Sequence, residues 1–353
     1  MVTIKEDSMK RLSIVRDPVY LEHKTGEFHP ESHHRLEVLY RLLDQVEIKK
    51  LYGTLEPRKA TRAEIEYIHS PAYFKKAEAT AGKSVTYLDP DTVASAGTFK
   101  AALYAAGGVL AGIDSLFSGA ADSVLALIRP PGHHAEHDGG MGFCIFNNVA
   151  VGAVYAMKQH TIERVLIVDW DLHHGNGTQH AFYADPRVLY FSTHQYPYYP
   201  GSGAADEVGQ GAGEGFTVNV PLAPGMGDNE YLTIFRNILT PIADRYRPQL
   251  VIVSAGFDTY RDDPLGGMEL TSSGYATLTE IVKTIAEMHA EGRLLVALEG
   301  GYDLRGLQES VKSVIHTLIS ETKSGLPVYD REKDNGSYIE NVLAVQRRFW
   351  DCF

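Results

Sequence analysis

The sequence predicts an α/β fold in which a central, mostly parallel β-sheet carries helices on both faces. Short, wholly apolar runs bounded by turn residues are typical of strands buried in such a sheet. These runs lie at 123–128, 164–169, 188–192, 250–254 and 294–298. Segments of helical character separate several of them, at 147–159, 229–246 and 273–292. This alternation of strand and helix favours a doubly wound arrangement, with one sheet between two layers of helices.

The N-terminal third is predicted to be mainly helical and to pack onto this sheet. Helical segments are expected at 31–46, 62–70 and 97–117. No Pro/Gly/Ser-rich linker or repeat interrupts the chain, so we expect one domain over residues 1–353. Within it, residues 1–19 are an N-terminal segment whose first eight residues read as an extension. A C-terminal tail over 321–353 is expected to dock either on this domain or on a second subunit of a homo-oligomer.

The composition is that of a folded protein without an evident affinity for nucleic acid or membranes. Apolar residues make up 44% of the chain and charged residues 22%, and the formal net charge of −12 opposes binding to phosphates. The two cysteines are too few for a disulfide framework, which favours a reducing compartment, and we expect the cytoplasm. No apolar stretch reaches the roughly 20 residues that span a bilayer, and the N-terminal segment does not read as an export signal.

Loops rich in His, Asp and Tyr follow the predicted strands. They are RPPGHHAEHDGG (129–140), DWDLHHGNG (169–177), THQYPYYPGSG (193–203), AGFDTYRDDP (255–264) and EGGYDL (299–304). In open parallel sheets, ligands bind beyond the carboxyl ends of the strands. The loops are therefore expected to converge on one site.

Asp171, His173 and Asp258 are candidate ligands of a catalytic zinc ion. Such a site takes three protein ligands from His, Asp and Glu and leaves one position for water. Residues 171 and 173 have the Asp-x-His spacing in which alternate residues of an extended segment point the same way. Alone, this spacing is more often a surface or capping feature, but its occurrence together with Asp258 at strand ends favours a metal site.

Residues suited to proton transfer lie in the same loops. His133 and His134 follow a rigid Pro-Pro-Gly turn, and neutral imidazole can take and return a proton near neutral pH, although a histidine pair alone would read as solvated. Asp169 and Asn176 are candidates to orient the two rings, with loop capping as the alternative. Tyr302 could donate its hydroxyl to the oxygen that becomes negative in a tetrahedral intermediate, whereas a lone tyrosine is usually a core or rim residue.

Four segments carry a resemblance to a known family. They are RPPGHHAEHDGGMGFCIFNN (129–148), VDWDLHHGNGTQHAFY (168–183), SAGFDTYRDDPLGG (254–267) and ALEGGYDL (297–304). These segments resemble the histone deacetylase and acetylpolyamine amidohydrolase family, and the likeness runs from about Tyr20 to about Ile319, including HPESHHRL at 29–36. Asn176 agrees with the class II pattern WDxHHGNGTQ, where class I enzymes usually carry Asp. The chain is therefore similar to the class II and bacterial amidohydrolase branch.

The resemblance implies an arginase-like α/β fold that holds one zinc ion per chain on the three candidate ligands. It implies His134 as general base and acid, with His133 as its electrostatic partner. It also implies Tyr302 as the oxyanion donor, so that the reaction is hydrolysis of an acylated amine.

By the same resemblance, a narrow channel for the acyl-bearing chain leads to this site. The residues implied are Phe143 and Tyr199 as walls, Gly142 in the lining, Leu265 at the rim and Asp91 as an acceptor for the substrate backbone. Phe is commoner than Tyr at the Tyr199 position, so Tyr198 is the alternative for that wall.

A structural potassium ion is implied behind the zinc. The residues concerned are Asp169, Asp171, His173, Ser192 and Thr193, largely through their backbone carbonyls. Oxygen ligands of this kind suit a hard cation.

Several alternatives concern the substrate and the activity. Acyl-lysine or a small acylated amine is the expected substrate; an acetylpolyamine is the alternative, although polyamine enzymes of the family tend to carry an acid where this chain has Leu265. The additional aspartates of a dinuclear manganese ureohydrolase are not apparent. A catalytically inactive acyl-lysine binding protein would lack one of the three candidate zinc ligands or Tyr302, and all four residues are present.

Cys144 follows Phe143 in an apolar stretch, so we expect it to be a small buried apolar residue and not a nucleophile.

Overall fold

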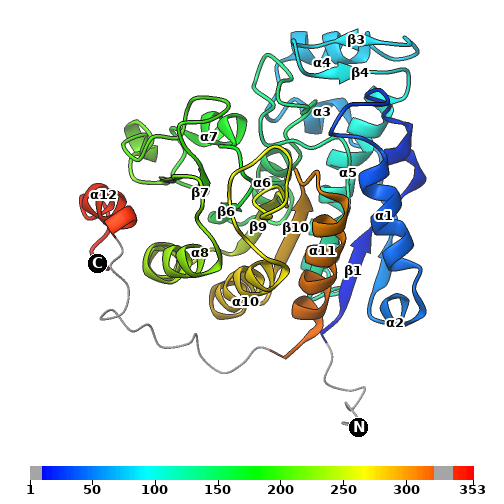
Figure 1. Cartoon of the computed structure of the whole chain (residues 1–353). Helices are drawn as coiled ribbons and strands as arrows, with labels where there is room; N and C mark the ends of the chain where they lie inside the picture. The colour runs from blue at the N-terminus through cyan, green and yellow to red at the C-terminus, as the bar shows by residue number, and fades with distance from the viewer. Residues whose placement is uncertain (1–9, 322–336) are drawn as a thin grey trace.

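The computed structural model describes residues 10–321 and 337–353, and its centre is one eight-stranded sheet in which every neighbouring pair of strands is parallel (Figure 1). From one edge to the other, the strands are β2 (Gly53–Leu55), β1 (Leu12–Val15), β5 (Ser123–Ala126), β10 (Leu294–Leu298), β9 (Leu250–Ala255), β6 (Val165–Asp169), β7 (Val188–Gln195) and β8 (Thr217–Leu222). A two-stranded antiparallel sheet, β3 (Thr86–Tyr87) and β4 (Val93–Ala94), lies apart from it.

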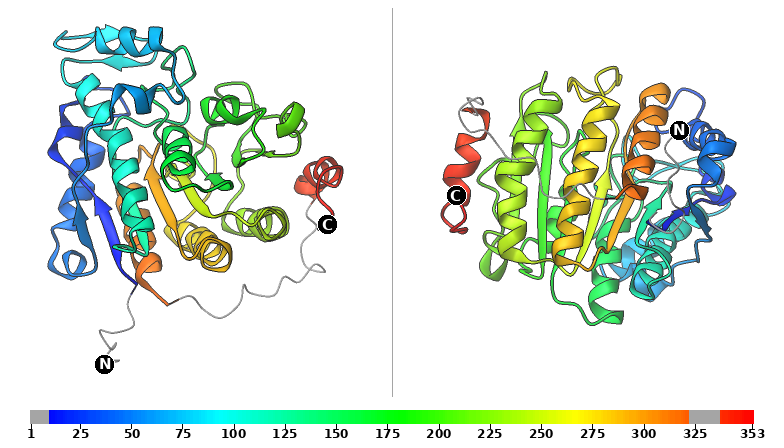
Figure 2. Two further views of the ribbon diagram at one scale, coloured as in Figure 1. Left: turned by 180° about the vertical axis from the view of Figure 1, so that it is seen from behind. Right: turned by 90° about the horizontal axis from the view of Figure 1, so that it is seen from below.

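Helices cover both faces of the large sheet (Figures 1 and 2). One layer holds α5 (Thr98–Phe117) and α6 (Asn148–Gln159). The other holds α8 (Asp228–Ile234), the π-helical η4 (Phe235–Leu239), α9 (Thr240–Tyr246), α10 (Ser272–His289) and α11 (Leu304–Ile319), with α1 (His34–Leu43) beside α11. Because both faces are covered, strands β5, β6, β9 and β10 are buried along their whole length. The predicted fold class is confirmed.

Shorter elements occupy the connections. They are η2 (Pro18–Glu22), α2 (Val46–Lys49), α3 (Arg62–Ile65), α4 (Pro71–Glu78), α7 (Asn176–Phe182), η3 (Gly211–Gly213) and α12 (Ser337–Gln346). Among the described residues, no helix combines the length and the apolar character that crossing a bilayer requires.

The predicted helix at 273–292 ends earlier than its apolar pattern suggests. Its last helical residue is His289, since Glu291 and Gly292 take the positive φ values of 52° and 81°. The N–H of Gly292 donates to the carbonyl of Ala286 at 2.9 Å, which satisfies an acceptor of the last helical turn. Local backbone chemistry therefore sets this boundary.

Three strands of the sheet were not predicted. Strand β1 has only four residues between Arg11 and Arg16, and β2 has three at the edge of the sheet. Strand β8 contains Pro221, a residue that lacks a backbone donor and occurs in edge strands, where β8 lies. Residues within the predicted N-terminal segment 1–19 thus include an inner strand of the sheet.

The described part of the C-terminal tail packs on its own chain. Helix α12 contacts β8, and the indole of Trp350 donates to the carbonyl of Gly215 at 3.0 Å. The rings of Trp350 and Phe216 lie 5.6 Å apart, edge to face. The expected extension at 1–8 and the first part of the tail lie outside the described residues.

A buried charge network joins the N-terminal region to the loops at the carboxyl ends of β5 and β10. Glu31 accepts from Arg35 Nη1 at 3.1 Å and from Arg129 Nη2 at 2.7 Å, and all three side chains are fully buried. Arg35 also donates to the carbonyls of Glu299 at 2.6 Å and Gly301 at 2.7 Å. Burial acts to raise the pKa of Glu31, but the charge of Arg129 and its hydrogen bonds hold that pKa well below its ordinary value.

The substitution Glu31→Gln is expected to lower the free energy of unfolding by about 3–5 kcal/mol, because it leaves two buried guanidinium groups without their carboxylate. Urea denaturation measures this change. As a control, Glu66→Gln breaks the partly exposed pair with Arg62 and should cost less than about 1 kcal/mol. Equal losses in the two variants would contradict the importance of the buried network.

Candidate functional site

One cavity of about 190 Å³ is lined by nine of the predicted site residues. It is lined by Asp91, Pro131, His133, His134, Gly142, Phe143, His173, Tyr199, Leu265, Gly300 and Tyr302. Pro131 and Gly300 are the lining residues that the sequence did not single out. The loops therefore converge as expected from the parallel arrangement of the strands.

Asp171, His173 and Asp258 form a compact cluster in which His173 lines this cavity, with their ligand atoms within 4.8 Å of one another. His173 Nδ1 lies 3.3 Å from Asp171 Oδ1 and 3.3 Å from Asp258 Oδ2. Ligand atoms at about 2.0–2.1 Å from a tetrahedral zinc ion lie about 3.3–3.4 Å apart. The spacing of the three side chains thus fits one zinc ion.

The surroundings of the cluster also fit a cation. Asp258 Oδ2 is buried and has no hydrogen-bond partner, which is costly for a carboxylate oxygen unless an ion compensates it. The other oxygens are fixed: Asp258 Oδ1 accepts from the N–H of Leu172 at 3.0 Å, and Asp171 Oδ2 accepts from the N–H of Gly300 at 2.9 Å. A Cβ at Gly300 would lie 2.3 Å from Asp258 Oδ2, so glycine is required beside the carboxylates.

His133 and His134 lie side by side, with ring centroids 4.0 Å apart. His134 Nδ1 is 2.7 Å from Asn176 Oδ1, and the Asn176 amide nitrogen donates to Glu136. Because this second contact fixes the amide orientation, His134 Nδ1 is the donor and Nε2 of the neutral ring is free to accept a proton. His133 Nδ1 lies 3.1 Å from Asp169 Oδ2.

The two histidines differ in charge preference. Burial lowers the pKa of His134 well below its ordinary value, and the neighbouring charges of His133 and His173 lower it further. Burial also acts to lower the pKa of His133, but the carboxylates of Asp171 and Asp169 outweigh it and raise that pKa to about 10. The pair therefore combines a neutral imidazole with a cationic one.

Tyr302 is held by its backbone and by its ring. Gly301 precedes it with φ of 116°, and the N–H of Tyr302 donates to Asp263 Oδ2 at 2.6 Å. The guanidinium of Arg35 lies 5.0 Å from the centre of the Tyr302 ring, and the ring of Phe143 is 6.1 Å away, edge to face. These contacts orient the side chain into the cavity that it lines.

The channel walls include a strained residue. Phe143 takes φ of 68°, a left-handed conformation that costs a non-glycine residue roughly 1–2 kcal/mol. Gly142 before it has φ of 55°, and a Cβ there would lie 2.3 Å from His134 Cδ2. Thr92 Oγ1 accepts from the N–H of Phe143 at 3.1 Å, and Asp91 Oδ1 accepts from the N–H of Gly142 at 3.1 Å, so the rim fixes this wall.

The opposite wall is formed by Tyr199, whose ring meets His134 edge to face at 5.2 Å. Tyr198, the alternative for that wall, instead stacks on His173 at 5.7 Å and donates its hydroxyl to the carbonyl of Leu265 at 3.0 Å. Tyr199 is the one of the two that lines the cavity.

Three of the predicted potassium residues, Asp169, Ser192 and Thr193, lie on the neighbouring strands β6 and β7, whereas Asp171 and His173 lie in the loop after β6. Asp169 on β6 is level with Ser192 on β7, and Ser192 Oγ is 2.9 Å from His194 Nδ1. Thr193 Oγ1 is buried without a hydrogen-bond partner.

A model of the histone deacetylase domain matches residues 29–318, most of the chain. The chain belongs to the histone deacetylase family. This membership supports a hydrolase that acts on amide bonds, with the arginase-like α/β fold of the family.

Relatives in the histone deacetylase family match over most of this chain. A probable deacetylase from Archaeoglobus fulgidus is 38% identical, over 96% of this chain and 99% of the archaeal protein. Histone deacetylase 15 from Arabidopsis thaliana is 40% identical over 84% of this chain, which spans 54% of that longer protein. The crystal structure of the HDA15 HD domain matches with a TM-score of 0.87 at 37% identity, covering 96% of both chains.

Several residues that support the loops around this cavity were not predicted from the sequence. Glu299 Oε2 accepts from the N–H groups of Gly132 at 2.6 Å and His133 at 3.3 Å, which fixes the histidine loop. Asp263 accepts from the N–H groups of Leu265, Tyr302 and Asp303. Both acids occur in the quoted motifs, and their partners are backbone groups that a sequence pattern does not reveal.

Cys144 is fully buried, as expected from its apolar surroundings in the sequence.

Proposed function

We propose that this member of the histone deacetylase family is a zinc-dependent enzyme that removes an acetyl or similar acyl group from an amine nitrogen. Acyl-lysine or a small acylated amine is the proposed substrate. The observation that carries the proposal is the cluster of Asp171, His173 and Asp258, in which His173 lines the same cavity as His134 and Tyr302. The two cysteines, neither in a disulfide, agree with a reducing compartment such as the cytoplasm.

The three clustered side chains would hold the zinc ion. When bound, zinc lowers the pKa of a coordinated water towards about 7 and polarises the amide carbonyl. His134 takes a proton from the attacking water at its free Nε2, which the hydrogen bond from Nδ1 to Asn176 leaves unprotonated. The same imidazole then gives that proton to the leaving amine, so that the acid and the amine are the products. His133 supplies positive charge beside it.

Tyr302 supplies a hydrogen bond to the oxygen that becomes negative as water adds to the carbonyl. Burial raises the pKa of Tyr302 well above its ordinary value, so the hydroxyl keeps its proton and can donate it in a hydrogen bond. A donor of this kind accelerates the reaction only if it is already in place when the charge develops. The contacts of Tyr302 with Arg35 and Phe143 support such preorganisation.

The cavity walls support an extended acyl-bearing chain. Phe143 and Tyr199 would enclose its apolar part, and Asp91 at the rim would accept hydrogen bonds from the substrate backbone. Potassium would be held by Asp169, Ser192 and Thr193, and the unpaired Thr193 hydroxyl supports an oxygen-liganded cation there.

The zinc content of two variants distinguishes a zinc ligand, Asp258, from a residue that only transfers protons, His134. The substitution His134→Ala should lower turnover by about 10²–10⁴-fold, because it removes general acid and base catalysis, while the zinc content after dialysis stays unchanged. Asp258→Asn should lose the zinc itself, since one of its three ligands is weakened. Metal analysis of the two dialysed variants measures the difference. Loss of zinc from His134→Ala would show that His134 is a ligand.

Removal of the Tyr302 hydroxyl tests whether the protein is an enzyme or an acyl-lysine binding protein. The substitution Tyr302→Phe keeps the ring and should lower kcat by about 10²–10³-fold while KM changes little, because the lost bond forms only in the transition state. Steady-state kinetics measures both constants. A variant with near-normal kcat would require another oxyanion donor.

The substrate class is tested with zinc-loaded enzyme on acetyl-lysine peptides, longer acyl-lysine peptides and acetylpolyamines. We expect the highest kcat/KM on an acyl-lysine peptide, because Leu265 adds no second carboxylate beside Asp91 at the rim to attract the free amines of a polyamine. The substitution Leu265→Glu should shift the ratio of kcat/KM towards acetylpolyamines. A wild-type preference for acetylpolyamines would contradict the proposed substrate.

A further inference from the structure

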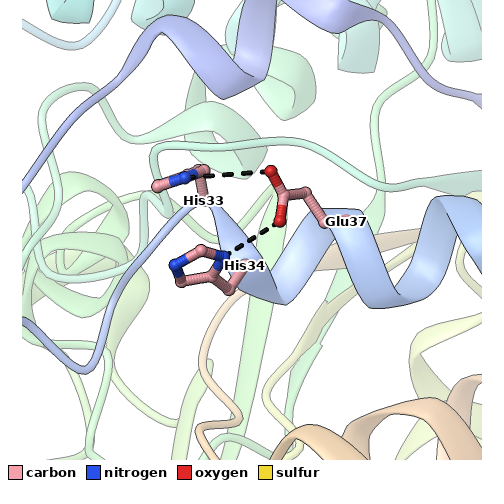
Figure 3. A group of neighbouring side chains, drawn as sticks. All are labelled: His33, His34 and Glu37. Carbon is pink, nitrogen blue, oxygen red and sulfur yellow. Dashed lines mark hydrogen bonds and ion pairs between the residues drawn. The ribbon is translucent and has the colours of Figure 1, made fainter. Parts of the chain in front are cut away.

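We propose that the first turn of α1 carries a second, peripheral metal site, formed by His33, His34 and Glu37, that takes a transition-metal ion such as Zn²⁺. The site lies away from the cavity lining and does not depend on the proposed deacetylase mechanism. Figure 3 shows the two imidazoles directed at the same carboxylate.

The distances within this cluster are close to those of a tetrahedral site. His33 Nε2 lies 3.8 Å from Glu37 Oε1, and His34 Nδ1 lies 2.9 Å from Glu37 Oε2. The two imidazole rings are 4.2 Å apart, and all three ligand atoms lie within 4.8 Å of one another. Ligand atoms that share a tetrahedral zinc ion lie about 3.3–3.4 Å apart, so rotations of exposed side chains bring the three atoms to one ion.

Helix geometry explains the convergence. Glu37 is four residues after His33 and three after His34, the two spacings that place side chains on neighbouring turns of one helix face. His33 is the N-cap residue of α1, but its side chain makes no capping hydrogen bond. Both imidazoles are therefore directed at Glu37 and not at the backbone.

The donor set selects the class of ion. Two imidazoles and a carboxylate suit zinc and its neighbours in the transition series, whereas Mg²⁺ and Ca²⁺ prefer oxygen ligands. Metal binding needs an unprotonated imidazole. The ion therefore competes with protons for these two imidazoles.

The site should bind more weakly than the cluster in the cavity. The side chains of His34 and Glu37 are 55% and 37% exposed, so water competes for the ion. The positive end of the α1 dipole and the charge of Lys24 also act against a cation. The two sites should consequently fill in sequence, the cavity first and the helix second.

The experiment is a titration with ZnCl₂ of untagged enzyme that already holds one equivalent of zinc, followed by isothermal calorimetry. We expect one further equivalent to bind to the wild-type protein. In the double variant His33→Ala, His34→Ala this second event should be lost, and Glu37→Gln should weaken it at least tenfold. The control variant His289→Ala removes a histidine that contacts Asp244 at 2.7 Å and should bind zinc like the wild type.

Absence of a second binding event in the wild type would overturn the proposal, as would equal binding by the double variant. Circular dichroism of each variant verifies that the fold is retained. The variant Asp258→Asn separates this proposal from the deacetylase function, because it should lose the first equivalent and keep the second. Failure of catalysis in any variant therefore has no bearing on the helix site.

Discussion

Parallel pairing of the inner strands is the constraint on which the whole site depends. Asp169, the last residue of β6, is level with Ser254 on β9 and with Ser192 on β7. The loops that follow these strands therefore start at one height on the sheet. Asp171 comes two residues after Asp169, and Asp258 comes three residues after Ala255, the end of β9. A shift of one residue in this register would separate the two carboxylates.

The buried network around Glu31 adds a second level of order. Arg35 donates to the carbonyls of Glu299 and Gly301, so a segment near the N-terminus fixes the loop that carries Tyr302. The geometry of the proposed site thus depends on contacts between residues about 260 positions apart in the sequence. This explains why the motif at 29–36 belongs with the site although none of its residues lines the cavity.

The sequence allowed prediction of features that have a local signature. Five of the six inner strands are apolar runs, and the Asp-x-His pair together with Asp258 after a strand indicates a candidate metal site. Strand β8 was not predicted because it contains Pro221, a residue that is unusual in strands away from a sheet edge. Strand β1 was not predicted because its four residues are too few to show a clear apolar run. The roles of Asp263 and Glu299 rest on hydrogen bonds to distant backbone groups, which become visible only when the fold is assembled.

The position of Asp263 has a consequence for changing what the cavity accepts. Its Oδ1 accepts from the N–H of Leu265 at the rim, and its Oδ2 accepts from the N–H groups of Tyr302 and Asp303. Asp263 thus fixes the backbone both at the rim residue Leu265 and at the loop that carries Tyr302. The Leu265 side chain can be substituted without loss of this hydrogen bond, because the backbone N–H of Leu265 donates it. Inserting or deleting residues between Asp263 and Leu265 would instead move the Tyr302 backbone together with the cavity entrance.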